Sequence, residues 1–293
     1  MVVVCLAPTD LRPEVDDLTG TVRADARRAD LTPADSAALE HALTVAEAWD
    51  GWVLAVAAGP PDIDEVLQRA AALGAEAVRV EAGAHGSPAV PGPVPLAATD
   101  LVGGPEELAA SLAAAVRARG NPALVLCGDR SARHGIGALP ALLADELGLD
   151  QALGLVSVSV QERGRLVVER RLDGGWRERL AVSGPAVLSV EGAGVRLRRA
   201  SLAAALGTGP DAVGSEPARP SGRCPGELHF GAPRPYRPRT RPVAPPEGSA
   251  HDRLLALTGA LALREPARVV GPVGAREAAG ELIAYLRRFG YTD

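Results

Sequence analysis

Short apolar runs alternate with segments of helical spacing through the first half of the chain, and this alternation constrains the fold more than any other feature. The apolar runs occupy residues 2–6, 52–57, 77–80 and 123–127. Between and after them, residues 32–46, 62–73, 105–119 and 138–147 have the spacing of helices. Strands that alternate with helices of ten to fifteen residues predict βαβ units and a parallel sheet covered on both faces. The predicted fold is therefore a three-layer α/β domain with a parallel sheet.

The first helix has a clear start. Thr32 supplies an N-cap, Pro33 suits the first turn, and Asp35 favours the positive end of the helix. Leu39 and Leu43 then recur at helical spacing on one face.

The second half of the chain follows a different pattern. Residues 156–160 alternate strictly, and further strand-like runs at 166–170, 176–182 and 186–190 are separated by Gly-containing turns. This predicts a small antiparallel β meander at about 154–192. The whole α/β domain is predicted to span residues 1–206, with a segment at about 193–206 that leads out of it.

A compositional change marks the rest of the chain. Residues 207–250 are dense in Pro, Gly and Arg and poor in aliphatic side chains, which predicts an extended arm without a core of its own. Two amphipathic segments follow, at about 252–263 and 275–289. We expect residues 251–293 to form a helical segment that packs on something else.

Composition excludes several classes of function. The net charge is −5 and arginines are interspersed with acidic residues, so nucleic-acid binding is not expected. The sequence has no lysine, which excludes a Schiff-base lysine and a P-loop lysine. Its three cysteines are widely spaced and odd in number, a pattern typical of a reducing cytoplasm. The first residues lack a basic region and predict a strand rather than a signal or membrane segment.

The loop from Gly128 to Gly137 is the most informative local feature. It follows a buried strand and leads into a helix, which is where nucleotides lie in open α/β sheets. Arg130, Arg133 and His134 are available there to pair with phosphate oxygens. Pro140 replaces the third glycine of a dinucleotide fingerprint. Two readings of this loop therefore stay open, a nucleotide site and an ordinary βα loop with solvated charges.

No catalytic constellation is apparent. The five histidines form none of the spacings typical of metal sites, and no nucleophile elbow or Cys/His pair is present. Asp10, Asp35 and Asp129 have no spacing that marks an acid/base pair, so structural or capping roles are expected for them.

In the order of its motifs the chain resembles the β subunits of electron transfer flavoproteins. Residues 32–43 (TPADSAALEHAL) are similar to the family's NPxDxxALExAL, and Gly59-Pro60 followed by residues 65–75 (EVLQRAAALGA) to its GP…ExLRxALAMGAD signature. Similar matches extend through 122–128 (PALVLCG), 143–148 (LADELG), 173–175 (DGG), 184–190 (GPAVLSV) and the final helix.

The resemblance implies a nucleotide-binding-like α/β domain that carries a small β meander and an arm ending in helix, and it implies a non-enzymatic electron carrier. In this family a β subunit carries a structural AMP, helps to form the FAD site of an α subunit in a heterodimer, and relays electrons from a dehydrogenase to an acceptor. By position, the nucleotide contacts fall on Cys5, Thr32, Pro33, Ala34, Asp35, Ala58, Gly128, Asp129, Arg130, Ser131, Ala132, Arg133, His134, Gly135, Ile136, Gly137, Ala138 and Leu139.

The chain departs from the family at several of these positions. Arg133 and Gly135 replace acidic residues of the loop, Ala138 replaces a glutamine, and Thr32 replaces an asparagine. Each lost neutral hydrogen bond weakens nucleotide binding by about 1 kcal/mol, and an Arg133–phosphate pair would recover part of that. An occupied AMP site, a site for FAD and NADH as in bifurcating relatives, and an empty scaffold site all remain open.

Residues 200–206 (ASLAAAL) resemble the family's recognition segment for partner dehydrogenases, with Leu202 as the anchoring leucine and Leu206 beside it. A Gly207–Thr–Gly–Pro–Asp stretch replaces the Lys-rich stretch that follows in the family. The lysine-free, arginine-rich and proline-extended sequence is similar to an actinobacterial branch associated with the redox cofactor mycofactocin. A stand-alone adenine-nucleotide-binding module is the alternative that needs no α subunit.

Overall fold

The structure is a computed structural model that describes residues 1–16, 22–23, 25, 28–81, 105–131, 137–218, 248–258, 271 and 273–288. The chain divides into two compact units, Met1–Tyr236 and Arg237–Asp293. Residues 82–104 and most of the expected arm lie outside the described residues.

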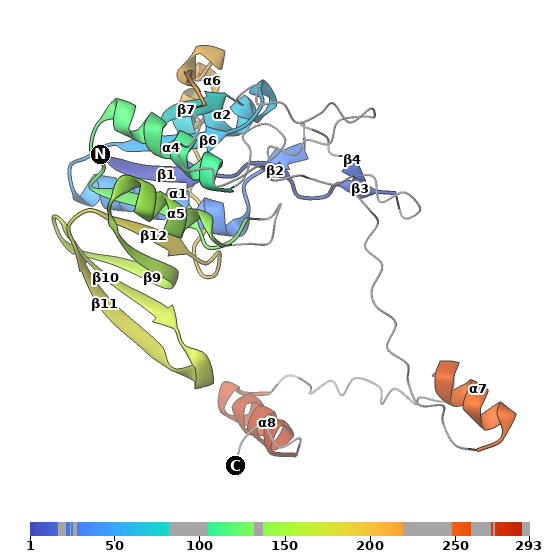
Figure 1. The fold of residues 1–293 in the computed structure, drawn as a ribbon. Coiled ribbons are helices and arrows are strands. Elements are labelled where there is room, and N and C mark those ends of the chain that lie inside the picture. The colour runs from blue at the N-terminus through green and yellow to red at the C-terminus, as the bar shows by residue number, and fades with distance from the viewer. Residues whose placement is uncertain are drawn as a thin grey trace. The chain divides into compact units, whose positions relative to one another are not determined.

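Within the described part of the first unit, nine strands form one sheet (Figure 1). In spatial order they are β11 (Arg177–Ser183), β10 (Arg165–Arg171), β9 (Asp150–Glu162), β12 (Ala186–Val190), β8 (Leu124–Gly128), β1 (Val2–Leu6), β6 (Val53–Ala58), β7 (Glu76–Glu81) and β13 (Val213–Pro217). From β9 to β13 all neighbours pair in parallel. β10 and β11 extend the sheet as an antiparallel pair. The α/β fold predicted from the alternation of strands and helices is confirmed.

Four helices form the two outer layers of the parallel sheet (Figure 1). They are α1 (Pro33–Ala48), α2 (Asp64–Ala72, preceded by the 3-10 turn Pro61–Ile63), α4 (Pro105–Arg119) and α5 (Leu139–Leu147). Side chains of α1 and α2 belong to one apolar cluster, and those of α4 and α5 belong to a second cluster on the other face. None of the described helices combines the length and the apolar run that a membrane crossing needs.

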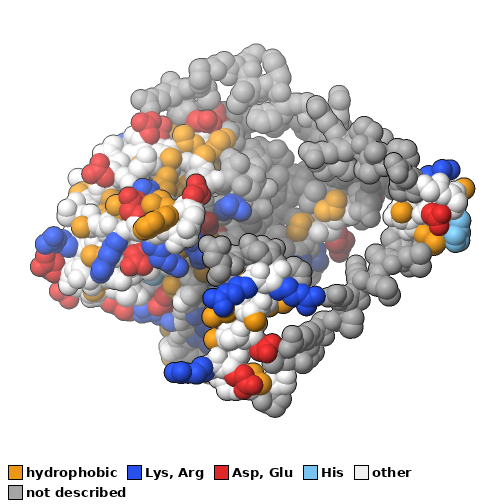
Figure 2. All heavy atoms as spheres, turned by 90° about the horizontal axis from the view of Figure 1, so that it is seen from below, with side chains coloured by type: hydrophobic (Ala, Val, Ile, Leu, Met, Phe, Trp, Pro, Cys, Tyr) orange, Lys and Arg blue, Asp and Glu red, His pale blue; other side chains and the backbone are white. Residues whose placement is uncertain are grey.

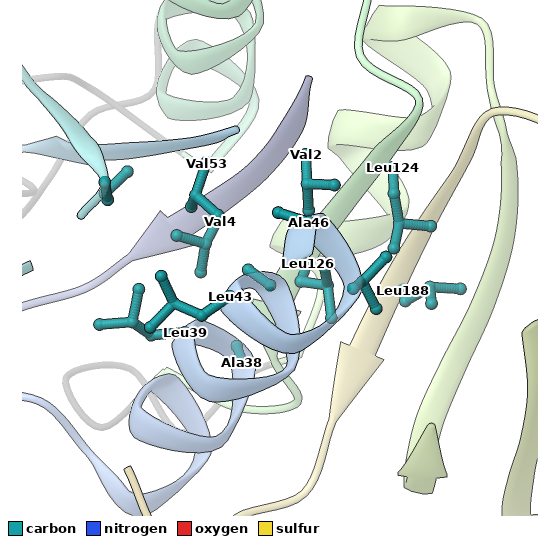
Figure 3. Close-up of a cluster of buried hydrophobic side chains, with 14 of the residues drawn as sticks. Val2, Val4, Ala38, Leu39, Leu43, Ala46, Val53, Leu124, Leu126 and Leu188 are labelled. Atoms are coloured by element: carbon teal, nitrogen blue, oxygen red, sulfur yellow. The ribbon is translucent and has the colours of Figure 1, made fainter. Parts of the chain in front are cut away.

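The packing of α1 is the largest contact of a helix with the central strands. Leu39, Leu43 and Ala46 lie over Val2 and Leu126 from two adjacent strands (Figure 3). Leu39 is 1% exposed and Leu126 is fully buried. Burial of one such leucine contributes roughly 1.5–3 kcal/mol, so this helix is fixed firmly on the strands that it covers.

The strand at 186–190 corrects the expected meander. β12 pairs in parallel with both β8 and β9 instead of joining the antiparallel strands. All five of its residues are buried, as in an interior strand of a parallel sheet. The first part of the 13-residue β9 pairs with β12 and its later part with β10, so one strand belongs to both arrangements.

The beginning of the expected arm also differs from prediction. Val213–Pro217 forms β13, an edge strand paired with β7, so residues 207–218 belong to the first unit. Arg119 bridges the two strands, with Nε 3.1 Å from Glu76 and Nη2 3.3 Å from Glu216. The strand is short and ends in proline, as edge strands commonly do.

Between β1 and α1 the chain forms a segment outside the main sheet, and contacts with Asp10 stabilise this segment. Its two small ribbons pair β2 (Thr9–Asp10) with β5 (Ala29–Asp30), and β3 (Glu14–Val15) with β4 (Val22–Arg23). The Asp10 carboxylate accepts the backbone N–H groups of Arg12 and Asp25 and lies 3.3 Å from Arg28 Nε. The hydrogen bond from Asp25 is the main cause that lowers the pKa of Asp10. Asp10 is therefore structural, as expected.

The second unit contains the helices α7 (Ala250–Thr258) and α8 (Ala275–Arg288), which confirms two closing helices. Ser249 and Asp252 cap α7 reciprocally, with hydrogen bonds of 3.1 and 3.2 Å between backbone N–H groups and side chains. On α8, Leu282 and Ile283 are 59% and 46% exposed. These two apolar side chains of α8 are thus largely exposed.

Gly192, which follows β12, tests the packing of this segment on α1. A Cβ placed there would lie 2.6 Å from Pro33 Cβ and 2.8 Å from the backbone nitrogen of Ala34. We predict that Gly192→Ala lowers the free energy of unfolding of the chain by about 1–3 kcal/mol, measured by urea denaturation. The control is Gly207→Ala, because nothing lies within 4 Å of a Cβ there. Equal stability of both variants would contradict this packing.

Candidate functional site

The order of the parallel strands reverses beside β1. The chain passes from β1 to β6 and β7 on one side, and then returns to place β8 and β12 on the other side. At such a switch point the loops that leave the carboxyl ends of two neighbouring strands diverge and open a crevice, which is where ligands bind in open α/β sheets. Here that point lies between Leu6 at the end of β1 and Gly128 at the end of β8.

The N-terminus of α1 closes one side of this edge. Thr32 Oγ1 accepts the backbone N–H of Asp35 at 3.0 Å and donates its own hydrogen to Asp35 Oδ2 at 2.8 Å. A Cβ on Gly128 would lie 2.9 Å from Asp35 Oδ1 and 3.2 Å from Ala34 Cβ. The N–H of Asp35 is already bonded to Thr32, and Gly128 packs against this cap. The start of α1 therefore offers little room for an anion.

The buried carboxyl group of Asp35 is electrostatically unusual. The residue is 4% exposed. Burial raises the pKa of Asp35 to about 6, although hydrogen bonds from Thr32 oppose this shift, and the charge of Asp129 adds to it. Below about pH 6 the group is therefore largely neutral.

Cys5 and Cys127 form a second buried pair under the site. They are direct neighbours in the register of β1 and β8, and both are free thiols. A hydrogen bond with Cys5, and then burial, raise the pKa of Cys127 well above its ordinary value. The thiol of Cys5 thus faces Cys127 inside the protein, and it does not point out of the edge.

The start of α5 is open, unlike that of α1. Its N-cap, Ala138, makes no side-chain hydrogen bond, Pro140 fills an early helical position, and the first turn has no acidic residue. Gly137 and Ala138 are both exposed. The N–H groups and the helix dipole at such an end favour an anion, while the carbonyl oxygen of Asp129 lies 2.4 Å from where a Cβ on Gly137 would stand. This end of the site fits a phosphate group.

Most of the residues expected to contact a nucleotide lie along this one edge. They are Cys5 at β1, Thr32, Pro33, Ala34 and Asp35 at α1, Ala58 at the end of β6, Gly128, Asp129, Arg130 and Ser131 after β8, and Gly137, Ala138 and Leu139 at α5. The expected contacts Ala132, Arg133, His134, Gly135 and Ile136 lie outside the described residues.

The segment after β12 is a part of this edge that the sequence did not indicate. The N–H of Asp129 donates to the carbonyl oxygen of Val190 at 2.9 Å, and Gly192 covers the start of α1. Residues 186–190 were expected in the meander, so their carboxyl end was not expected here. The available sequence signal was the run AVLSV at residues 186–190, which is apolar except for Ser189 and so fits an interior parallel strand.

A separate exposed feature follows on the same chain segment. Helix α6 (Leu202–Gly207) is capped by Ser201, whose Oγ accepts the N–H of Ala204 at 3.1 Å. Leu202 and Leu206 are 75% and 78% exposed and lie one helical turn apart. Arg196 and Arg199 before the helix are exposed as well. On the face of the molecule seen in Figure 2, acidic and basic side chains are interspersed.

The described residues contain no cluster of three or more His, Cys, Asp or Glu side chains that could hold a metal ion.

The titration of Asp35 yields a testable prediction. The folded chain holds this proton up to about pH 6, whereas the unfolded chain releases it near 3.8. The free energy of unfolding contributed by this group therefore falls as the pH rises between these values, by about 3 kcal/mol. Asp35→Asn removes this loss, so its stability relative to the wild type should increase from pH 4 to pH 7 in urea denaturation. A difference that stays constant over that range would contradict the buried neutral carboxyl.

Comparisons with known proteins agree with this geometry. The family model of the electron transfer flavoprotein domain matches residues 19–208. The chain is 32% identical over 177 residues to proteins of Mycobacterium bovis and Mycobacterium tuberculosis, each named electron transfer flavoprotein subunit beta. These matches cover 58% of this chain and 60% of each relative.

A protein of the same name from Chromohalobacter salexigens is 39% identical over 74 residues, which are 25% of this chain and 28% of that protein. The chain thus matches less than two thirds of the length of these relatives. The domain match ends before β13. On the shared domain and the parallel sheet that carries it, the chain belongs to the electron transfer flavoprotein β subunit family.

Proposed function

We propose that this chain is the β subunit of a heterodimeric electron transfer flavoprotein. It binds AMP at the carboxyl edge between β1 and β8, completes the FAD site of an α subunit, and relays electrons from a dehydrogenase to an acceptor. It acts as a carrier subunit and not as an enzyme. The observation that carries this proposal is the open N-terminus of α5 at the switch point of the sheet.

The AMP phosphate would bind at α5 and its loop. The exposed backbone at Gly137 and Ala138 offers N–H donors, and Arg130, also exposed, adds a cation nearby. Thr32 and Asp35 are hydrogen-bonded to each other, so they would form part of the wall of the site without binding the phosphate. In this arrangement the nucleotide is bound mainly by backbone N–H groups. Such donors remain available even though several side chains of the loop differ from those of the family.

The α subunit would be held by the second unit. Leu282 and Ile283 of α8 are largely exposed, and such a surface is typical of an interface. FAD, when bound, supplies the electron chemistry, and this chain contributes shape and orientation. The free, buried thiols of Cys5 and Cys127 agree with a cytoplasmic location, where thiols stay reduced.

The electron donor would dock on α6. Leu202 and Leu206 form a small apolar anchor beside the exposed Arg196 and Arg199, which fits an apolar pocket with an acidic rim. We propose the mycofactocin-associated branch as the setting of this carrier, because the sequence is lysine-free, arginine-rich and proline-extended. The stretch from Gly207 onward, which replaces a lysine-rich stretch, argues against a generic acyl-CoA dehydrogenase as the donor.

The first prediction from this function concerns bound nucleotides. Co-expression with the cognate α subunit should give a yellow heterodimer that releases one FAD and one AMP on denaturation, measured by mass spectrometry. FAD bound by the isolated chain would favour a bifurcating β subunit instead. A chain that binds adenine nucleotide but no α subunit would favour a stand-alone nucleotide-binding module.

The same heterodimer can identify the donor. Two purified enzymes serve as probes, an acyl-CoA dehydrogenase and a mycofactocin-dependent dehydrogenase, and reduction of the flavin is followed by its absorbance. The proposed branch requires faster reduction by the second enzyme. Faster reduction by the acyl-CoA dehydrogenase would overturn the assignment to that branch.

A second prediction concerns the surface that binds the α subunit. Leu282→Ser combined with Ile283→Ser should weaken binding of the α subunit at least about tenfold, because it removes two exposed apolar residues of α8. Binding is measured by titration of labelled α subunit. The matched control is Leu254→Ser with Leu257→Ser on α7, which changes two equally exposed leucines of the same unit. Unaltered affinity of the α8 variant would show that α8 does not form the interface.

A further inference from the structure

Arg198 joins the chain segment before α6 to the outer face of α1. Its Nε donates to Glu40 Oε1 at 3.0 Å, its Nη2 lies 2.9 Å from the same oxygen, and its backbone N–H donates to Glu40 Oε2 at 2.9 Å. Its Nη1 also pairs with Glu47, and its Nη2 donates to Thr44 Oγ1 at 3.3 Å. Glu40, Thr44 and Glu47 are about one helical turn apart, so one side chain spans two turns of α1.

This contact differs from an ordinary surface ion pair. The Glu40 side chain is only 17% exposed. Burial opposes the ionisation of Glu40, yet the hydrogen bonds from Arg198 outweigh it and hold the pKa of Glu40 below its ordinary value. Exposed pairs contribute little, but a partly buried arginine fork with several acceptors fixes both position and direction.

The segment that Arg198 fixes has few other anchors. Residues 191–201 form neither helix nor strand. Val195 and Leu197 are only partly buried against the core, and Gly192 packs on the start of α1. Arg196 and Arg199 are exposed. Arg198 is therefore the last strong attachment before the cap of α6 at Ser201.

Helix α6 depends on such attachments. Six residues are too few for a helix to persist in water without tertiary support. Downstream, the 3-10 turn Pro210–Ala212 contacts α2, and β13 pairs with β7. Helix α6 itself also contacts α2. The two exposed leucines are thus presented by a short helix that contacts α2 and is held between the sheet edge at β13 on one side and Arg198 on the other.

We propose that Arg198 is a positioning residue for donor docking: through Glu40, Thr44 and Glu47 it holds α6 in the orientation in which Leu202 and Leu206 meet the dehydrogenase. The inference rests on the proposed function. Without Arg198 the leucines are still present, but their ordering has to occur when the donor binds, so the affinity falls while the rate within the assembled complex is kept.

The test uses the heterodimer and whichever of the two donor enzymes reduces the wild-type protein. Arg198→Ala should raise the KM of the donor for the heterodimer about tenfold and change kcat by less than about twofold. Glu40→Gln should act in the same direction, and Arg198→Lys should lie between Arg198→Ala and the wild type, because lysine keeps the charge and loses the fork. Amide hydrogen exchange over residues 199–207 should quicken about tenfold in Arg198→Ala but not over β13.

Two controls separate this inference from the proposed function. Arg165→Ala removes an arginine from another ion pair, with Glu162 at 3.0 Å, and should leave KM unchanged. Leu202→Ala should raise KM if α6 docks the donor. If Leu202→Ala raises KM and Arg198→Ala does not, the positioning role is wrong and docking on α6 stands.

The remaining outcomes are also decisive. Loss of FAD or a large fall in melting temperature in both Arg198→Ala and Glu40→Gln would assign the contact to overall stability and overturn the positioning role. If Leu202→Ala has no effect, or neither donor reduces the wild-type heterodimer, donor docking on α6 fails, and the role of Arg198 fails with it.

Discussion

Because β1 lies between β6 and β8, the loops that leave the centre of the sheet diverge at a single edge, and the remaining features of the first unit are arranged around this edge. Helix α1 covers the strands on one side and α5 begins on the other. The cap formed by Thr32 and Asp35 closes the start of α1, while the start of α5 stays open. A parallel sheet thereby places, at one edge, a helix start that suits an anion and a helix start that is closed by its own cap.

Helix α1 also links the carboxyl edge between β1 and β8 to α6. Its first turn packs against Gly128 and Gly192, its inner face lies on the central strands, and its outer face carries the carboxylates that hold Arg198. The segment after β12 runs along α1, which it contacts at Gly192 and at Arg198, before it reaches α6. One firmly packed helix can therefore set the geometry of both sites, which suits a carrier that works by placing a cofactor and a partner at fixed positions.

The sequence predicted the elements whose signals are local. The cap at Thr32, the span of α4 and the runs of β1 and β8 follow from residue types within a few positions. The pairing of β12 and β13 was not predictable in this way, because the choice of neighbour depends on the whole sheet. The burial of Asp35, the Cys5–Cys127 contact and the Arg198–Glu40 contact, which joins residues 158 positions apart, likewise arise only when distant segments meet. The resemblance placed the nucleotide contacts on one edge, but it did not distinguish the closed start of α1 from the open start of α5.

The most direct test of the account locates the nucleotide. The heterodimer is reconstituted with 8-azidoadenosine monophosphate, irradiated, digested and mapped by mass spectrometry. The account predicts labels on peptides from the edge between β1 and β8, namely residues 5–10, 32–35 or 128–139, and competition by unlabelled AMP. Labels confined to the β10–β11 hairpin or to α7 and α8, or labelling that AMP does not reduce, would contradict a nucleotide site at this switch point.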